Sequence, residues 1–177
     1  MNQLFTRLML LIGRGRFTTV NDSGVAQMVQ ARMGAIELKD NIPRIAEFGF
    51  TSNPPIGSDA VVAFIGGNRD NGVIVATGHQ ASRPTGLHAG ETMLYSQDGK
   101  YIYLTASGGI VINANDQPVT INDATTVTIN AATQIIFDTP LVATTGNLTV
   151  GTGVSGSFTT PAGNVVTVQD GIVTNIE

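Results

Sequence analysis

The stretch that decides the fold is Gln117–Asn130, QPVTINDATTVTIN, because it contains the four-residue segment VTIN twice. The two copies begin at Val119 and Val127, eight residues apart. Valine, threonine and isoleucine favour β-strands. Asparagine tolerates left-handed backbone angles and hydrogen-bonds its own chain, so it favours turns. The stretch therefore predicts very short strands separated by tight turns.

The same pattern continues on both sides of this stretch. Five similar segments begin at intervals of nine, nine, eight and eight residues: Tyr101–Leu104, Ile110–Asn113, Val119–Asn122, Val127–Asn130 and Ile135–Asp138. Shorter copies follow at Leu148–Val150, Val165–Val168 and Ile172–Val173. A period of eight residues is shorter than that of any helical repeat family. It fits strands that wind round a long axis.

One chain of such repeats cannot cover its own strand edges. Alternate residues such as Val119 and Ile121 form a dry face, and Thr120 lies on the other. Exposed edges are normally protected by Lys, Pro or bulges, but residues 101–177 contain no Lys and only three Pro. We therefore predict a homotrimer whose intertwined chains form a triple-stranded β-helix, with fifteen Thr of this half on the outside. The predicted trimer core comprises Ile110, Ile112, Val119, Ile121, Val127, Ile129, Ile135 and Phe137.

The preceding half has the pattern of a small antiparallel barrel. Its predicted strands are Arg16–Val20, Val25–Gln30, Ala35–Leu38, Arg44–Phe48, Ala60–Ile65 and Val73–Thr77. The clearest hairpin joins the apolar runs Val61–Ile65 and Val73–Ala76 through a loop rich in Gly, Asn and Asp. Short strands at this density fit an OB-fold-like barrel, whose closure removes exposed edges. The predicted fold class is all-β.

The first residues predict a short amphipathic helix. Apolar side chains recur there at spacings of three and four, namely Leu4, Phe5, Leu8, Met9 and Ile12. The run is shorter than the about 20 residues that a membrane span needs, and no small-residue cleavage site of a signal peptide follows it. We expect this helix to dock on another protein surface.

Charge divides the chain near residue 100. All nine Lys and Arg and eight of the acids lie at or before Lys100, whereas five acids follow it, so the halves carry net charges of +1 and −5. We predict three parts: a helical segment at 1–15, the OB-fold-like barrel at 16–100 and the trimeric β-helix at 101–177. The second half has no cation for phosphates, so nucleic acid is not an expected partner. The chain has no Cys, which excludes disulfides and thiol chemistry.

No motif predicts an enzyme, a cofactor, a metal or a small-molecule substrate. Gly151-x-Gly153-x-x-Gly156 matches a dinucleotide fingerprint, but the β-type run that follows it favours a turn. His79 and His88 are nine residues apart, which does not suit a metal pair unless a carboxylate such as Glu91 joins them. We interpret both histidines as ordinary exposed side chains.

Several longer segments resemble the baseplate spike proteins of contractile-tailed phages, and in particular the phage Mu baseplate spike family. The segments that carry the resemblance are Pro43–Arg44 with Phe48–Pro54, Val62–Arg69, Gly72–Ala76, Arg83–Leu87, Gly90–Glu91 with Leu94–Tyr95, and Gly163–Val173. The similarity as a whole covers nearly the whole chain.

The resemblance implies a virion protein, assembled in the host cytoplasm, at the tail baseplate. Its barrel would join the tail hub and other baseplate proteins. Its trimeric β-helix would be driven transiently through the bacterial outer membrane when the sheath contracts. Related spikes often end in a His-x-His iron site, but no His follows His88 here. Either the trimer ends bluntly at Gly171–Val173 or a separate tip protein caps it, and the missing ligands motivate the second hypothesis.

An alternative from another class is an OB-fold module that binds a glycan or nucleic acid and stands on a fibrous trimeric stalk. It requires stacking aromatic and basic side chains on the barrel. With seven Phe, three Tyr and no Trp, the chain offers few such rings.

Overall fold

The computed structural model describes residues 3–177, which divide into two compact units between Ile121 and Asn122. The first unit contains a short helix, a barrel and a three-stranded sheet, and the second contains another three-stranded sheet. In the part of the chain that the structure describes, no helix has the length and apolar character needed to cross a membrane.

The N-terminal helix is shorter than the sequence predicts. Helix α1 (Gln3–Met9) ends before Ile12, which instead begins the first barrel strand. Met1 and Asn2, also within the predicted helical segment, lie outside the described residues. Ile12 therefore does not belong to the helical apolar face on which we placed it.

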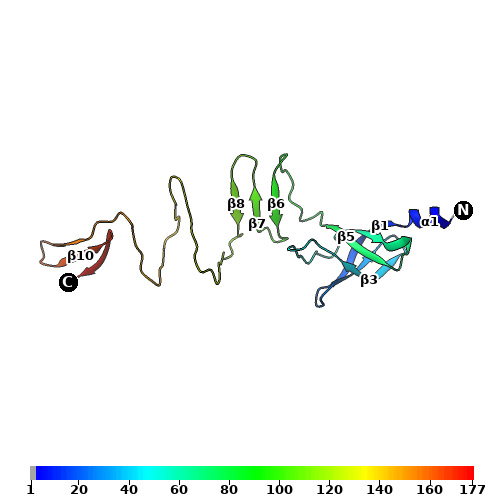
Figure 1. The fold of residues 1–177 in the computed structure, drawn as a ribbon, viewed down its shortest axis with the longest axis horizontal. Coiled ribbons are helices and arrows are strands. Elements are labelled where there is room, and N and C mark those ends of the chain that lie inside the picture. The colour runs from blue at the N-terminus through cyan, green and yellow to red at the C-terminus, as the bar shows by residue number, and fades with distance from the viewer. Residues whose placement is uncertain (1–2) are drawn as a thin grey trace. The chain divides into compact units, whose positions relative to one another are not determined.

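Five strands form a closed barrel (Figure 1). They are β1 (Ile12–Asn21), β2 (Gln27–Arg32), β3 (Leu38–Arg44), β4 (Asp59–Phe64) and β5 (Gly72–Gly78). Strand β1 pairs antiparallel with β2 and β4, and β5 closes the ring between β4 and β3. The β3–β5 contact is parallel and joins Arg44 to Ile74. This closed barrel is compatible with the predicted OB-fold.

The alternation of β1 sets which side chains enter the barrel. Gly13, Gly15 and Phe17 face inward, where a Cβ on either glycine would meet the Met33 side chain at 2.7 Å or less. Arg14 and Arg16 therefore face outward. The inward side chains form one apolar core, which comprises Phe17, Val29, Ala31, Ile42, Ala60, Val62, Phe64 and Ile74.

Two predicted barrel strands are wrong in position. The segment predicted as Ala35–Leu38 is mainly the turn between β2 and β3, where the Met33 N–H donates to the Glu37 carbonyl oxygen at 2.9 Å. The segment predicted as Arg44–Phe48 leaves β3 after Arg44. Its apolar side chains suggested a strand, but Phe48 is fully exposed and Gly49 adopts a φ of 88° in the turn that follows.

The predicted hairpin between β4 and β5 is confirmed. Strand β4 leads into a short 3-10 helix, η1 (Ile65–Gly67), and a loop that returns the chain to β5. The contact of α1 with the barrel is made here, because Gly67 lies so close to helix α1 that a Cβ would stand 2.5 Å from the Arg7 carbonyl oxygen.

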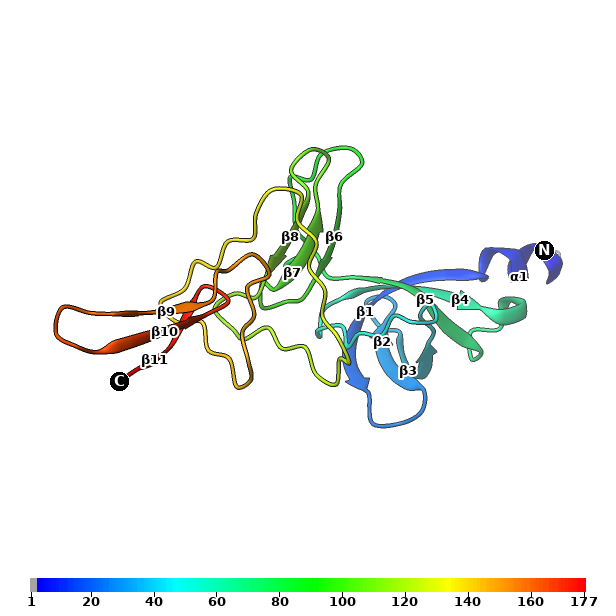
Figure 2. The ribbon, with the colours of Figure 1, turned by 60° about the vertical axis from the view of Figure 1, so that its left-hand side comes forward.

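After the barrel, the first unit continues into a meander of three strands. Strand β6 (Thr92–Tyr95) pairs with β7 (Tyr101–Leu104), which pairs with β8 (Ile110–Asn113), all antiparallel (Figure 2). Strands β7 and β8 are the first two predicted repeats. Strand β6 was not predicted.

The second unit ends in a sheet with β10 (Val165–Gln169) at its centre, between β9 (Gly156–Thr159) and β11 (Ile172–Ile176). Strands β10 and β11 contain two of the predicted short copies, whereas Leu148–Val150 is not a strand. Among the described residues, the repeats at 119–122, 127–130 and 135–138 form no strand within their own chain. Their pairing between chains stays a prediction.

Candidate interaction surfaces

The sheet β6–β8 has one aliphatic face that no described residue covers. In its register Leu94, Ile102 and Ile112 lie opposite one another across the three strands, and Leu104 lies opposite Ile110. Cross-strand partners share a face, so all five side chains point the same way. They are 42–69% exposed. Two of them are predicted trimer-core residues, and the other three belong to the same surface although the sequence analysis did not select them.

The remaining trimer-core candidates are equally uncovered. Val119, Ile121, Val127, Ile129, Ile135 and Phe137 are 47–70% exposed. Soluble monomers seldom expose contiguous apolar surface of this kind, and large exposed patches mark interaction sites. The chain folded alone thus leaves these apolar side chains without a core in either unit.

The opposite face of the β6–β8 sheet carries Tyr103, which joins a polar network centred on Glu91. Glu91, just before β6, accepts a hydrogen bond from the Tyr103 hydroxyl and another, of 2.8 Å, from the His88 backbone N–H. The Ala106 N–H donates to its second oxygen at 3.3 Å. These bonds, led by the one from Tyr103, lower the pKa of Glu91 to about 2. The carboxylate therefore fixes the loop at 88–91 and the β7–β8 turn to β7.

The C-terminal sheet is fastened at its turn by a backbone contact. A Cβ on Gly153 would lie 2.0 Å from the Asp170 carbonyl carbon, so only glycine fits against this turn. The Gly171 N–H donates to the Val154 carbonyl oxygen at 3.2 Å, and the Asp170 N–H donates to Ser155 Oγ at 2.9 Å. Strand β9, not a helix, begins at Gly156. The Gly-x-Gly-x-x-Gly sequence is therefore a turn with a close chain contact, as interpreted from the sequence.

One face of this C-terminal sheet is also apolar. Phe158, Val166 and Ile176 lie opposite one another across β9, β10 and β11. The central Val166 is 6% exposed, but Phe158 and Ile176 are 57% and 62% exposed. The sheet buries one side chain by itself and leaves the flanking ones uncovered.

Helix α1 exposes the apolar side chains that we predicted to dock on another protein surface. Leu4, Phe5, Leu8 and Met9 are 58–68% exposed, and Ile12 at the start of β1 is 71% exposed. The helix thus keeps an apolar surface available to a partner, and Ile12 is exposed separately at the start of β1.

A groove of about 570 Å³ lies between the barrel loop 44–55, the segment after β5 and strand β6. Phe50 and Tyr95 line it together with Arg44. The Arg44 guanidinium donates to Gln27 Oε1 at 3.0 Å and to the Ser52 carbonyl oxygen at 2.9 Å. Because this cation is held by its own chain, the groove offers little of the basic stacking surface that the glycan- or nucleic-acid-binding alternative requires.

The histidines serve local contacts. His79 Nδ1 lies 2.7 Å from Ser82 Oγ, and His88 Nδ1 lies 3.4 Å from Glu91 Oε2. Within residues 3–177, no three His, Asp or Glu side chains gather in a way that could hold a metal ion.

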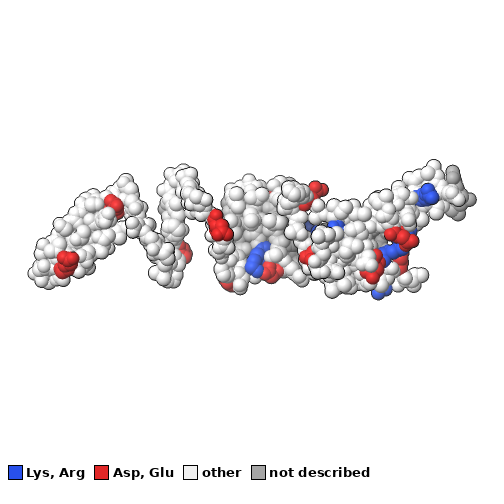
Figure 3. All heavy atoms as spheres, turned by 60° about the horizontal axis from the view of Figure 1, so that its bottom comes forward, with Lys and Arg blue, Asp and Glu red and all other residues white. Residues whose placement is uncertain are grey.

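Charged side chains are concentrated in the first unit, as Figure 3 shows. On the C-terminal unit the figure shows scattered acidic side chains among neutral ones. A short helix on a closed β-barrel, followed by repeats whose apolar side chains are uncovered, defines the class: a mostly β protein that combines a small barrel with a repetitive C-terminal part lacking its own core.

The comparisons with known proteins agree with this class. Residues 14–81 match the family described as Bacteriophage Mu Gp45, N-terminal, and residues 123–175 match the phage spike trimer family. The chain is 34% identical over 144 residues to the Mu-like prophage FluMu protein gp45 of Haemophilus influenzae, covering 81% of this chain and 76% of that protein. It is 28% identical over 177 residues to the baseplate puncturing device gp45 of Escherichia phage Mu, covering 98% of this chain and 85% of that protein. The chain belongs to the Mu gp45 family of phage baseplate spike proteins.

Proposed function

We propose that three copies of this chain form the central spike of a contractile phage tail and that residues 101–177 fold together as a triple-stranded β-helix. The observation that carries the proposal is that apolar side chains are uncovered in each unit taken by itself: Leu94 and Ile102 on the β6–β8 sheet of the first, and Phe137 in the repeats of the second. Three sister chains around an axis would cover these side chains and pair the open strand edges at once.

The proposed action is mechanical. A β-helix with its backbone hydrogen bonds satisfied between chains is stiff, and the repeats of eight or nine residues between 101 and 138 would leave only short turns between its strands. When the sheath contracts, the rod would be pushed through the host outer membrane. The proposed spike needs no catalytic group, cofactor or substrate for this step.

The barrel and helix α1 are the proposed base of the spike, held in the virion at the tail baseplate. Leu4, Phe5, Leu8, Met9 and Ile12 are exposed and apolar, and we propose that they contact the tail hub. A separate tip protein at the far end stays a hypothesis.

The mass in solution tests the trimer directly. Light scattering should give three times the chain mass of 18.4 kDa. Ile129→Asp would place a charge on the proposed axis and should reduce the mass to that of one chain or cause aggregation, because a desolvated unpaired charge is strongly destabilising. Thr128→Asp, one residue earlier and on the other face, is the matched control and should stay trimeric. A stable monomer of the unaltered chain would refute the proposal.

Piercing is tested separately, in particles that carry the same two variants. Phage with Thr128→Asp should infect normally, whereas Ile129→Asp should abolish infection. Particles that contain the trimeric spike could still infect although the spike does not cross the outer membrane. That result would refute the piercing role and leave the trimer unaffected.

A further inference from the structure

The outer face of the barrel carries a row of arginines whose direction is fixed by the backbone. In Ile12–Phe17, IGRGRF, the inward positions at 13 and 15 are glycines packed under Met33. A shift of β1 by one residue would drive Arg14 and Arg16 into the core, so the register is strongly specified. Their side chains are 75% and 62% exposed.

A third arginine lies directly beside this row. Arg32 on β2 is the cross-strand partner of Arg16 and is exposed. Like charges opposite each other on neighbouring strands destabilise a sheet. No hydrogen bond or ion pair within residues 3–177 joins the Arg32 side chain to another group. The pair is thus unfavourable for the isolated barrel.

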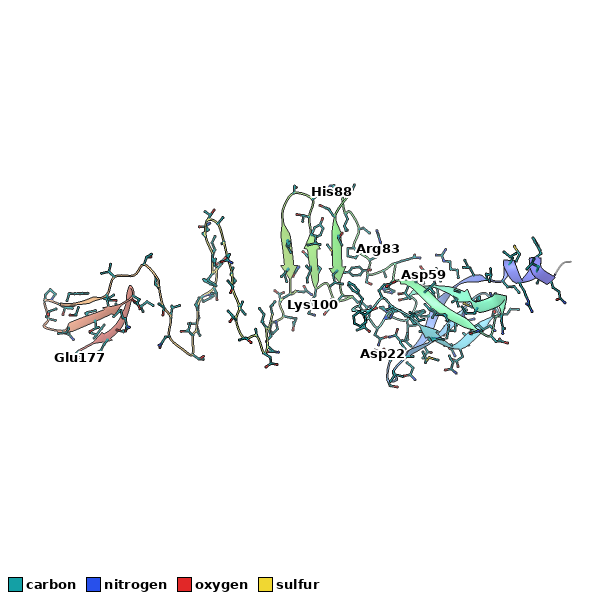
Figure 4. All side chains as sticks on the ribbon, viewed as in Figure 1. Asp22, Asp59, Arg83, His88, Lys100 and Glu177 are labelled. Atoms are coloured by element: carbon teal, nitrogen blue, oxygen red, sulfur yellow. The ribbon has the colours of Figure 1, made fainter. Side chains whose placement is uncertain are left out.

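Among the described residues, one acid pairs with Arg14 and Arg16, and none pairs with Arg32. Asp59 at the start of β4, labelled in Figure 4, lies opposite Arg16 and accepts its Nε–H at 3.2 Å, with Arg14 Nη2 at 3.8 Å. The same carboxylate accepts a hydrogen bond from Gln80, which is the main cause of the lowering of the pKa of Asp59. The patch of Arg14, Arg16, Arg32 and Asp59 therefore keeps a net charge of +2.

The other barrel cations differ, because their own chain satisfies them. Arg69 makes a two-point contact with Glu37, and Lys39 Nζ lies 2.8 Å from Asp70 Oδ1. Arg44 is held by Gln27 and Ser52. The chain as a whole has a net charge of −4, so the arginine patch is a local reversal of sign rather than part of a basic protein.

The border of the patch is aliphatic. Ile12 precedes Arg14 on the same face of β1, and Val61 is the cross-strand partner of Arg14; they are 71% and 38% exposed. Neither is aromatic, so the patch offers no ring on which a nucleic-acid base could stack. Guanidinium groups with aliphatic neighbours fit a protein surface that presents carboxylates beside apolar side chains.

From this charge complementarity we propose that the arginine patch is the surface by which the barrel docks on an acidic partner protein, whose Asp or Glu carboxylates pair with Arg14, Arg16 and Arg32. The inference rests on the proposed function, in which the barrel is the base of the spike. The partner carboxylates would neutralise the charges of Arg16 and Arg32. The repulsion between these two side chains, which destabilises the free barrel, would then be replaced by attraction to the partner.

The test uses the full chain and fluorescent poly-L-glutamate as the acidic probe at low ionic strength. The unaltered chain should bind it, and added salt should weaken the binding. Arg32→Gln should weaken binding about two- to fivefold while leaving the melting temperature unchanged or higher. The double variant with Arg14→Gln and Arg32→Gln should weaken binding of poly-L-glutamate further. Lys100→Gln, which removes the same charge at the β6–β7 turn (Figure 4), is the matched control and should not change binding.

Each other outcome overturns the inference. One is that the chain does not bind poly-L-glutamate. Another is that Arg32→Gln and Lys100→Gln weaken this binding equally. The third is that a single-stranded DNA oligonucleotide binds more tightly than poly-L-glutamate and that its binding depends on Arg32. Light scattering of the same samples separates this inference from the proposed function. A trimer that does not bind the probe refutes only the docking surface, whereas a monomer refutes the spike.

Discussion

The barrel and the C-terminal unit both contain many apolar side chains, but the barrel buries them in a core and the C-terminal unit leaves most of them exposed. In the barrel, eight apolar side chains are buried in one core, and the ring of strands leaves little open edge. In residues 122–177, Val166 is the only described apolar side chain that is buried. The difference teaches that apolar content does not itself make a core. A chain must also return on itself to cover its apolar side chains, and the short repeats cannot do so.

The largest expected effect on stability comes from truncating a phenylalanine, and we compare one phenylalanine of the barrel with one of the C-terminal unit. Phe64→Ala in the barrel core should lower the free energy of unfolding by about 3–5 kcal/mol, since Phe64 is 1% exposed and carries Arg69 over its ring at 4.2 Å. Phe137 is 68% exposed in the single chain. If Phe137→Ala also destabilises, sister chains must cover that ring.

Denaturant unfolding at several protein concentrations measures both variants. The cost of Phe64→Ala should not depend on concentration once trimer dissociation is taken into account. Phe137→Ala should shift the concentration at which the trimer forms. A Phe137→Ala variant identical to the parent at every concentration would contradict its place in the trimer core.

The second expected effect lies within the C-terminal unit. Gly153→Ala should detach the turn at Asp170 and Gly171, because the new Cβ meets backbone that cannot move aside. Overpacking of this kind costs about 1–3 kcal/mol or more. Limited proteolysis should then cut the β9–β11 sheet sooner. Gly151→Ala is the control, since no atom lies within 4 Å of its added Cβ, and equal protease resistance of the two variants would argue against the contact.

The smallest expected effect is the response of Glu91 to acid. Its pKa is lowered from 4.5 to about 2, first by the Tyr103 hydrogen bond and next by that of His88 N–H. A carboxyl group with a depressed pKa stabilises the fold above its unfolded value, and this contribution is lost as the pH falls from 4.5 toward 2. The melting temperatures of the parent and Glu91→Gln should therefore differ at neutral pH and converge over that range. A constant difference would mean that the charge of Glu91 is unimportant.

Much of the barrel could be predicted from its sequence because local signals agreed there. The run Val61–Ile65 and the Gly- and Asn-rich loop after it gave the β4–β5 hairpin at nearly its observed place. The segments around Ile36 and Phe48 were wrong because both are apolar yet exposed. A single sequence does not distinguish an apolar residue of the core from one that awaits a partner.

The surfaces were only partly predictable. The eight-residue period identified Ile110 and Ile112, but Leu94 joined them only through the register of β6, a strand that has no repeat signature. The arginine patch was missed because Arg16 and Arg32 are distant in sequence and meet only across paired strands. The turn at Gly153 was predicted correctly from the sequence. Its contact with Asp170 could not be predicted, because only the folded chain brings these two residues together.

The absence of lysine and arginine after Lys100 has a practical consequence for the preparation of this protein. Trypsin cuts only after those two residues, so it has no site anywhere in 101–177. Digestion that removes the barrel should leave this whole half as one intact piece. Its native assembly could then be purified without designing a shortened gene.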